Sequence, residues 1–234
     1  MSIASNLSTV HDRIARAARR AERNPGEIAL MAVCKTQPSE KIIEAYNAGH
    51  RLFGENRVQE FAEKFPALIK LGAAVFHMIG HLQSNKAAKA AEIFRAIDTL
   101  DSPNLAQRLN AAAAKLGKTL DVLIEINTGG EEAKSGVGVD LKELEPILSG
   151  AVEWPHLRIR GLMTVPPFGD DPEEARPYFR KLRQLRDLVA VRNIPCVNLA
   201  ELSMGMSHDF EVAIEEGSTC VRIGTAIFGE RPHP

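Results

Sequence analysis

The 234-residue sequence has only three cysteines, Cys34, Cys196 and Cys220. Their odd number and wide spacing exclude a disulfide framework and do not fit a zinc ribbon. A reducing cytoplasm is therefore the simplest compartment. No run approaches the ~18 consecutive apolar residues of a membrane span. The N-terminal stretch also lacks the charged-then-apolar order of a signal peptide. We expect a cytoplasmic protein with no membrane partner.

Aromatic residues are scarce, at 5%, and the net charge is only -1. A nearly neutral chain has no general attraction to nucleic acid or to anionic membranes. With 44% hydrophobic and 25% charged residues, the composition is that of a globular protein long enough for one large core. No linker, low-complexity tract or internal repeat interrupts it, which predicts a single domain over residues 1–234.

The first segment has apolar residues at intervals of four, three and four, which predicts a helix with one buried face: Ile3, Leu7, Val10 and Ile14. Its other side carries an arginine stripe: Arg13, Arg16, Arg20 and Arg23. Such a stripe is usually a solvated helix face. A docking surface for phosphates or for a partner is the alternative.

Eight short β-rich runs then alternate with helical stretches. The predicted strands are 28–36, 51–56, 74–80, 96–102, 121–127, 158–164, 198–205 and 220–228. The predicted helices are 38–49, 58–71, 84–94, 104–117, 141–150, 172–191 and 209–217. This alternation indicates a parallel sheet, and eight strands are the number that closes a (β/α)8 TIM barrel. An open doubly wound sheet is the competing architecture.

In such barrels the functional residues lie at the C-terminal ends of the strands and in the loops that follow them. The sequence places several polar or chemically distinctive residues there: Lys35, Asn56, residues 77–86, Met163, Ser203 and residues 222–225. Lys35 follows the apolar residues Val33 and Cys34. A lysine at a strand end usually extends into water. In a partly apolar pocket its pKa falls, and the free amine becomes a nucleophile toward aldehydes.

The last predicted strand contains Gly224 and Thr225, at the place where barrels commonly bind phosphate. Glycine permits close approach of backbone N–H groups, and the threonine hydroxyl is a further donor. Ser203 and Ser207 come from the neighbouring strand end. Ser207 is expected to cap the 209–217 helix. The alternative is that these glycines only form tight turns.

Arg222 lies two residues before Gly224, on the same side of the strand. A buried arginine needs a partner, because an unpaired buried charge is costly. The partner is either a carboxylate, from Glu125 or Glu201, or the ring nitrogen of a heteroaromatic ligand. An amine, a phosphate cradle and a donor to a ring nitrogen together describe one ligand, pyridoxal 5′-phosphate (PLP).

Seven ordered motifs cover nearly the whole chain: AVCKTQP, FGENRVQE, FHMIGHLQSNK, EEAKSG, RGLMT, LSMGMSHDFEVAI and VRIGTAIFG. In these motifs the sequence resembles the YggS/PROSC family of pyridoxal phosphate homeostasis proteins. The resemblance implies a barrel of the alanine racemase N-terminal domain type, with PLP held as a Schiff base on Lys35. It also implies a set of residues that line the cofactor, Asn56, Ser203, Arg222, Gly224 and Thr225, and a set near it, His77, Met163, Met204 and Ser207. Two mild departures are Cys34, where many members have serine, and Met78, where phenylalanine is frequent.

Three other motifs resemble catalytic, phosphate-binding or metal-binding signatures but depart from them. GMSHD (205–209) lacks the last glycine of a nucleophile elbow. GGEEAKSG (129–136) departs from the phosphate-binding P-loop at Thr128 and Ala133. His77 and His81 are four residues apart, but on a strand and a loop, so they need not converge on a metal. We therefore expect no metal and no hydrolase site.

Arg222 also bears on whether the protein is an enzyme. A donor opposite the pyridine nitrogen weakens PLP as an electron sink. Alanine racemases use a tyrosine from a partner subunit and an additional β-domain, which this sequence lacks. Tyr46 and Tyr178 lie in predicted outer helices. We therefore expect a monomeric protein that stores, buffers or delivers PLP to apo-enzymes, with little turnover. A racemase using His77 or His208 is the alternative, and a Schiff-base aldolase is a weaker one.

Overall fold

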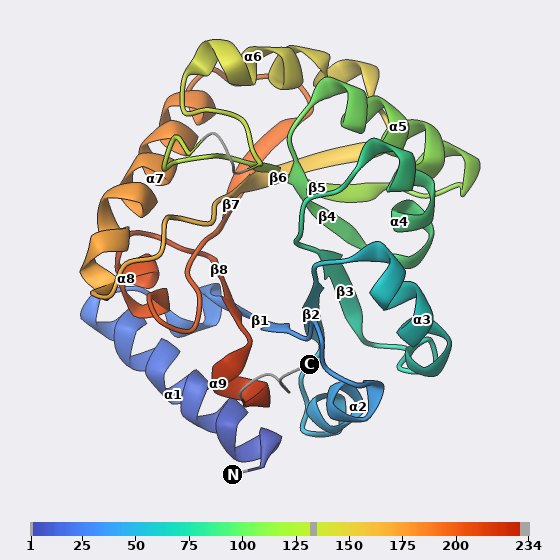
Figure 1. Cartoon of the computed structure of the whole chain (residues 1–234). Coiled ribbons are helices and arrows are strands. Elements are labelled where there is room, and N and C mark those ends of the chain that lie inside the picture. Colours follow the sequence, from blue (N-terminus) through green and yellow to red (C-terminus); the bar gives the residue numbers. More distant parts are fainter. Residues whose placement is uncertain (1, 132–134, 230–234) are drawn as a thin grey trace.

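Eight parallel strands form a closed barrel in which each strand pairs with its neighbour in the sequence and β8 pairs with β1 (Figure 1). The structure is a computed structural model that describes residues 2–131 and 135–229. The strands are β1 (Ala29–Val33), β2 (Leu52–Glu55), β3 (Val75–Met78), β4 (Ala96–Leu100), β5 (Leu120–Glu125), β6 (Leu157–Met163), β7 (Val197–Ser203) and β8 (Cys220–Ile223). The predicted (β/α)8 barrel is confirmed, and the open sheet is excluded because the strand order closes on itself.

The helices form a ring around the barrel (Figure 1). They are α1 (Ile3–Arg20), α2 (Ser39–Asn47), α3 (Val58–Leu68), α4 (Ala87–Ile93), α5 (Pro103–Lys115), α6 (Leu141–Gly150), α7 (Arg176–Ala190), α8 (Phe210–Glu215) and α9 (Thr225–Phe228). In the described residues they are accompanied by four 3-10 turns: Pro25–Glu27, Ser84–Lys86, Ala151–Glu153 and Pro172–Ala175. Each predicted helix is present, with ends that differ by a few residues.

One predicted strand is wrong in its second half. The apolar run 220–228 suggested a single long strand, but β8 ends at Ile223 and the short helix α9 begins at Thr225. Periodicity in a mostly apolar run of this length cannot separate a short buried strand from a buried helical turn. The strand therefore ends directly before Gly224, which is the N-cap residue of α9.

Side chains along β1 alternate between the two sides of the barrel wall. Ala32 and Cys34 belong to the large hydrophobic core between the strands and the surrounding helices. Met31 and Val33 belong to a smaller cluster inside the barrel. Because successive residues of a strand point to opposite faces, this register directs the next odd position, Lys35, toward the inside.

The N-terminal helix α1 packs beside α8, and the arginine stripe makes this contact (Figure 1). Arg13 Nε donates to Glu211 at 2.9 Å, and Arg20 bonds both Glu211 and Glu215. Arg23 donates to the carbonyls of Ile214 and Ser218 at 2.8 and 2.7 Å. The stripe is therefore mainly an intramolecular contact, rather than the solvated face expected from the sequence. Of its four members, Arg16 and Arg20 are exposed, whereas Arg13 and Arg23 are half-buried.

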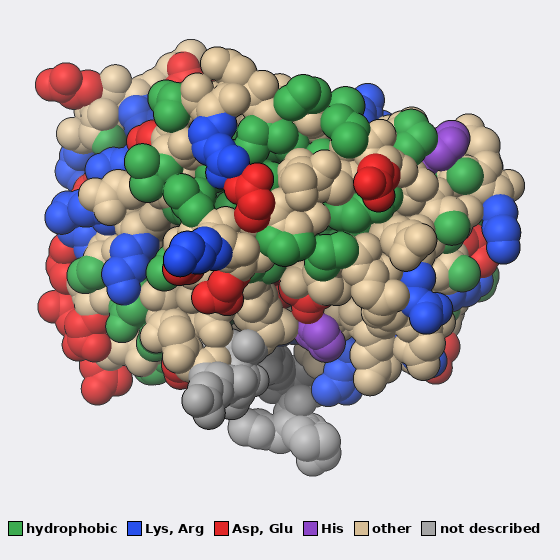
Figure 2. Space-filling model, turned by 90° about the horizontal axis from the view of Figure 1, so that it is seen from above, with side chains coloured by type: hydrophobic (Ala, Val, Ile, Leu, Met, Phe, Trp, Pro, Cys, Tyr) green, Lys and Arg blue, Asp and Glu red, His purple; other side chains and the backbone are tan. Residues whose placement is uncertain are grey.

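The molecular face in Figure 2 mixes hydrophobic side chains with both signs of charge, in agreement with the nearly neutral composition. Among residues 2–131 and 135–229, no helix is both long enough and apolar enough to cross a membrane.

Candidate functional site

A cavity of about 400 Å³ opens at the C-terminal ends of the strands. Six of the residues predicted for the site line it: Lys35, Asn56, Ser207, Arg222, Gly224 and Thr225. They come from four separate places in the sequence and meet only because the parallel strands all end at this side of the barrel. The cavity thus brings together side chains that are far apart in the sequence.

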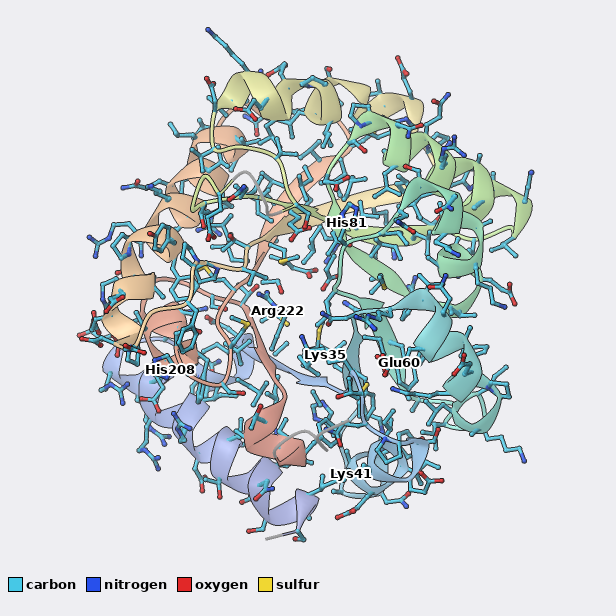
Figure 3. The ribbon with its side chains drawn as sticks, in the orientation of Figure 1. Lys35, Lys41, Glu60, His81, His208 and Arg222 are labelled. Atoms are coloured by element: carbon cyan, nitrogen blue, oxygen red, sulfur yellow. The ribbon has the colours of Figure 1, made fainter. Side chains whose placement is uncertain are left out.

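Lys35 is the second residue after β1 and is half-buried. Its backbone lies in a turn in which Gln37 N–H donates to Cys34 O at 3.1 Å. Val33 and Ile79 supply apolar surface to the same cavity. Figure 3 shows Lys35 and Arg222 near the middle of the ring, whereas Lys41 lies near α2 at its edge. Lys35 therefore lines a partly apolar cavity, which is one of the two environments that the sequence left open for it.

Arg222 is almost fully buried, with 3% of its surface exposed. Its guanidinium donates to Ser203 Oγ and to Thr164 O, both at 2.7 Å. Its hydrogen-bond acceptors are therefore a hydroxyl and a carbonyl, rather than a carboxylate of Glu125 or Glu201. Burial lowers the pKa of Arg222, while nearby acidic groups such as Asp98 and Glu125 act in the opposite direction. The bonds fix the side chain at the cavity wall as a cation.

Gly224 provides a close approach between β8 and β1. A Cβ atom at this position would lie 3.3 Å from Val33 O, which leaves little room for a side chain. The residue that follows, Thr225, is exposed at the start of α9 and lines the cavity. Glycine and threonine at a turn of the chain after the eighth strand are suited to an anionic group such as phosphate.

Asn56 follows β2 and contributes an unusual feature to the cavity wall. Within the described part of the chain, its Oδ1 atom is buried and has no hydrogen-bond partner. Buried polar atoms are rarely left in this state, so each exception needs an explanation. A ligand with a donor group, bound in the cavity, would supply the missing hydrogen bond.

The other four predicted residues do not line the cavity. Ser203 is fully buried and accepts the hydrogen bond from Arg222, so it lies behind the guanidinium. Met163 is fully buried in β6. Met204 packs in the core between barrel and helices. His77 Nδ1 lies 3.1 Å from Asp98 Oδ1 inside the barrel. None of the four is among the residues that line the cavity, and Ser203 contacts one of them, Arg222.

Ser207 lines the cavity but is not the N-cap of the following helix, which corrects the prediction. The helix α8 begins at Phe210, and its N-cap residue is Asp209. Asp209 Oδ1 accepts from Met206 N–H at 2.6 Å. The carboxylate of Asp209, two residues after Ser207, thus organises the turn before the helix, a role that was expected of the serine.

The loop between β6 and α7 also lines the cavity, although it was not predicted from the sequence as part of the site. Val165, Pro167, Phe168 and Asp171 line the cavity from this loop. The ring of Phe168 lies 5.6 Å from that of His208, which also lines the cavity. A signal was available, because the proline- and glycine-rich run VPPFGDDP directly follows a strand at the functional side of the barrel.

The two histidines considered as a metal pair have separate partners. His77 pairs with Asp98, and His81, which is exposed, lies 3.3 Å from Asp101 Oδ2. In residues 2–131 and 135–229, no group of three or more possible metal ligands was found. The GGEEAKSG segment lies partly outside the described residues, at 132–134.

An eight-stranded parallel barrel with a lysine after β1, a buried arginine on β8 and a glycine directly after β8 defines a protein of the alanine racemase barrel class. The sequence profile of the family "Alanine racemase, N-terminal domain" matches residues 5–232. The chain belongs to this family and, within it, to the YggS/PROSC group.

Relatives support this assignment over the full length. The chain is 47% identical to the "Pyridoxal phosphate homeostasis protein" of Aquifex aeolicus over 233 residues, covering 100% of both chains. It is 44% identical to the protein of the same name from Escherichia coli, covering 99% of this chain and 97% of that protein. The solved structure of PipY from Synechococcus elongatus with PLP bound is 36% identical, with a TM-score of 0.84 over 97% of this chain and 100% of that chain.

More distant structures share the fold alone. An alanine racemase from Corynebacterium glutamicum is 21% identical with a TM-score of 0.68, covering 94% of this chain and 62% of that chain. A D-threonine aldolase from Filomicrobium marinum is 16% identical with a TM-score of 0.73, covering 99% and 62%. Because both an isomerase and an aldolase share this barrel, the fold cannot by itself identify the reaction.

Proposed function

We propose that this chain is a PLP homeostasis protein that holds the cofactor as a Schiff base on Lys35. It stores or buffers PLP in the cytoplasm, or delivers it as a monomer to PLP-dependent apo-enzymes, with little turnover of its own. The observation that carries the proposal is the meeting of Lys35 with Arg222, Gly224 and Thr225 around one cavity. The names of the full-length relatives and the PLP-bound PipY structure support it.

The residues present fit this cofactor. The cavity of about 400 Å³ falls in the usual range for small-molecule sites, about 300–1,000 Å³. Its wall carries an amine at Lys35, a fixed cation at Arg222, and a glycine–threonine turn at Gly224. The unpartnered Oδ1 of Asn56 indicates that a polar ligand belongs here.

Each wall residue then has a distinct task. Lys35 would hold the aldehyde carbon covalently, and one water is lost as the C=N bond forms. Gly224 and Thr225 would hold the phosphate. Arg222 would present N–H groups to the pyridine ring, and Ser203 holds Arg222 from behind. PLP itself, when bound, supplies an electron sink.

The described structure supports little turnover in two ways. Arg222 can donate to a ring nitrogen but cannot accept its proton, which keeps the electron sink weak. Tyr46 and Tyr178 lie on α2 and α7, and neither lines the cavity. Tyr46 instead stacks under Arg51, with 4.0 Å between the guanidinium carbon and the ring centroid.

Reductive trapping tests the covalent bond. Purified protein saturated with PLP is treated with borohydride, digested and mapped by mass spectrometry. We expect the phosphopyridoxyl group on Lys35 alone and no trapped adduct in Lys35→Ala. The control variant is Lys89→Ala, because Lys89 is exposed on α4 and pairs with Glu92; it should be labelled like the wild type. Label on a different lysine in the wild type would refute the proposal.

Turnover is tested separately. Incorporation of deuterium at the α-carbon of free amino acids is followed in deuterated water with the PLP-loaded protein. We expect no exchange above that of free PLP. Rapid exchange that depends on Lys35 would instead establish a racemase, and replacement of His208 would then identify whether it is the second base, because this histidine lines the cavity.

A further inference from the structure

A cluster of charged side chains lies behind Lys35, on the opposite side of the barrel wall from the cavity. Its members are Glu55 at the end of β2 and Glu60 and Lys64 on α3. Lys64 Nζ donates to Glu60 Oε1 at 2.6 Å and to Glu55 Oε1 at 3.0 Å. Glu55 is completely buried, and the side chain of Lys64 is 13% exposed. None of the three lines the cavity, so the cluster has no part in the site described above.

The cluster binds both backbone neighbours of Lys35. Glu60 Oε1 accepts from Thr36 N–H at 2.6 Å, and Lys64 Nζ lies 3.4 Å from Cys34 O. The three ammonium donors of Lys64 therefore have three acceptors, one of which is the residue before Lys35. The residue after Lys35 is held by the same Glu60 oxygen that bonds Lys64.

The backbone of Thr36 has an unfavourable conformation that the hydrogen bond to Glu60 stabilises. Its φ angle is +62°, in the left-handed region, although it is a β-branched residue. Such residues are genuine outliers there, and turns that need this conformation usually have glycine or asparagine. A strained residue persists only when its surroundings hold it in place. The hydrogen bond from Thr36 N–H to Glu60 provides this restraint next to Lys35.

The electrostatics favour an ionised Glu60. Its burial raises the pKa, but hydrogen bonds from Lys64 and from Thr36 N–H outweigh this and leave the pKa below its usual value. For Glu55 burial prevails, and its pKa is raised in spite of Lys64. Glu60 is thus the carboxylate of the pair that is suited to accept two hydrogen bonds as an anion.

We propose that Glu60 is a positioning residue for Lys35: it fixes the strained Thr36 from behind the barrel wall and so directs the Lys35 amine into the cavity. The proposal rests on the Schiff base proposed above. Glu60 does not touch the cofactor; it acts through the backbone of the turn 34–37. Figure 3 shows Glu60 on the α3 side of Lys35.

The test is the rate of Schiff base formation after mixing with PLP, followed by its visible absorbance in a stopped-flow instrument. Misplacement of a reacting group by about 1 Å can cost on the order of 100-fold in rate, so we expect Glu60→Ala to be slower by about 10- to 100-fold. Glu60→Gln keeps an oxygen for Thr36 N–H and should recover most of the rate. The matched control is Glu63→Ala, an exposed glutamate on the same helix, which should react like the wild type.

A second readout separates positioning from general loss of structure. At saturating PLP, the Glu60→Ala protein should hold a larger share of cofactor as the free aldehyde, while its far-ultraviolet circular dichroism matches that of Glu63→Ala. Replacing Thr36 by glycine in the Glu60→Ala protein should restore the rate at least threefold, because glycine adopts positive φ without a side-chain clash.

Two outcomes overturn the inference: a wild-type rate in Glu60→Ala, or no recovery in the Thr36→Gly double variant. If Glu60→Ala does not fold, Glu60→Asp replaces it, with an expected slowing of at least threefold, and a wild-type rate again overturns the inference. Failure of the proposed function looks different, because the wild type itself would then form no Schiff base on Lys35.

Discussion

The guanidinium of Arg222 donates a hydrogen bond to Ser203 Oγ at 2.7 Å, and Ser203 is fully buried behind it. The family resemblance implied that Ser203 lines the cofactor, but the structure places it away from the cavity surface, against the arginine. Arg222 in turn lines the cavity and also donates to Thr164 O. Ser203 therefore acts on any ligand through the position of Arg222.

Replacing Ser203 by alanine is expected to destabilise the protein. The change removes a buried hydrogen bond to a charged group, which costs about 1.5–3 kcal/mol of unfolding free energy. PLP affinity should also fall, because the guanidinium can turn away from its place at the cavity wall. Urea denaturation of the PLP-free protein and titration with PLP measure the two effects. The control is Ser149→Ala on α6, an exposed serine whose replacement should change stability by less than about 0.5 kcal/mol. Unchanged stability in both variants would contradict this role of Ser203.

The pair formed by His77 and Asp98 predicts a pH dependence of stability. Burial lowers the pKa of His77, but the attraction and hydrogen bond of Asp98 outweigh it and raise the pKa above the ordinary value of 6.5. When a histidine has a higher pKa in the folded than in the unfolded state, its protonation stabilises the fold. This stabilisation is fully present below the pKa of the unfolded state and is lost as the pH rises through the pKa of the folded state. We therefore expect the contribution of His77 to be present at about pH 6 and to decrease above about pH 6.5.

The comparison of wild type with His77→Gln isolates this contribution, measured by urea denaturation at a series of pH values. The comparison is needed because His50 changes the free energy of unfolding with pH in the opposite direction. Burial lowers the pKa of His50, so protonation of this histidine destabilises the fold as the pH falls. The control is His11→Gln, an exposed position on α1. A stability difference between wild type and His77→Gln that grows with rising pH would refute the prediction.

Gly80, in the loop after β3, lies directly against the backbone of the cavity residue Asn56. A Cβ at this position would lie 2.3 Å from Asn56 O and 2.8 Å from Asn56 Cα, both backbone atoms. Gly80→Ala must therefore displace Asn56, a cavity residue, and overpacking of this kind costs about 1–3 kcal/mol. We expect lower unfolding free energy and weaker PLP binding. Gly72→Ala, where no atom lies within 4 Å of the new methyl group, should leave both quantities nearly unchanged. Equal behaviour of the two alanine variants would contradict the prediction.

The barrel could be predicted because its signals are local. Each strand is a short apolar run, each helix has its own periodicity, and eight alternations admit few architectures. The error at residues 220–228 came from the same source, since a continuous apolar run does not distinguish a strand from a helical turn. The loop after β6 was not predicted as part of the site because its marks in the sequence are proline and glycine rather than charged or nucleophilic residues.

The candidate site was predicted in part. Lys35, Arg222 and Gly224 could be placed together, because the C-terminal ends of parallel strands meet at one side of the barrel. The position of Ser203 behind Arg222 could not be predicted, since it depends on how far each side chain reaches across the barrel interior. The arginine stripe was assigned to solvent because its partners could not be seen locally. The helix α8, which it contacts, is about 200 residues away in the sequence.

The sequence by itself determined the order of strands and helices and the residues found at each strand end, since periodicity and strand direction are properties of the local chain. The tertiary structure alone decided which partners those residues have. Arg222 bonds Ser203 and Thr164, and Thr36 bonds Glu60, across separations of 19, 58 and 24 residues. Such contacts depend on the closure of the barrel and the packing of α3 against it, which no local pattern in the sequence contains.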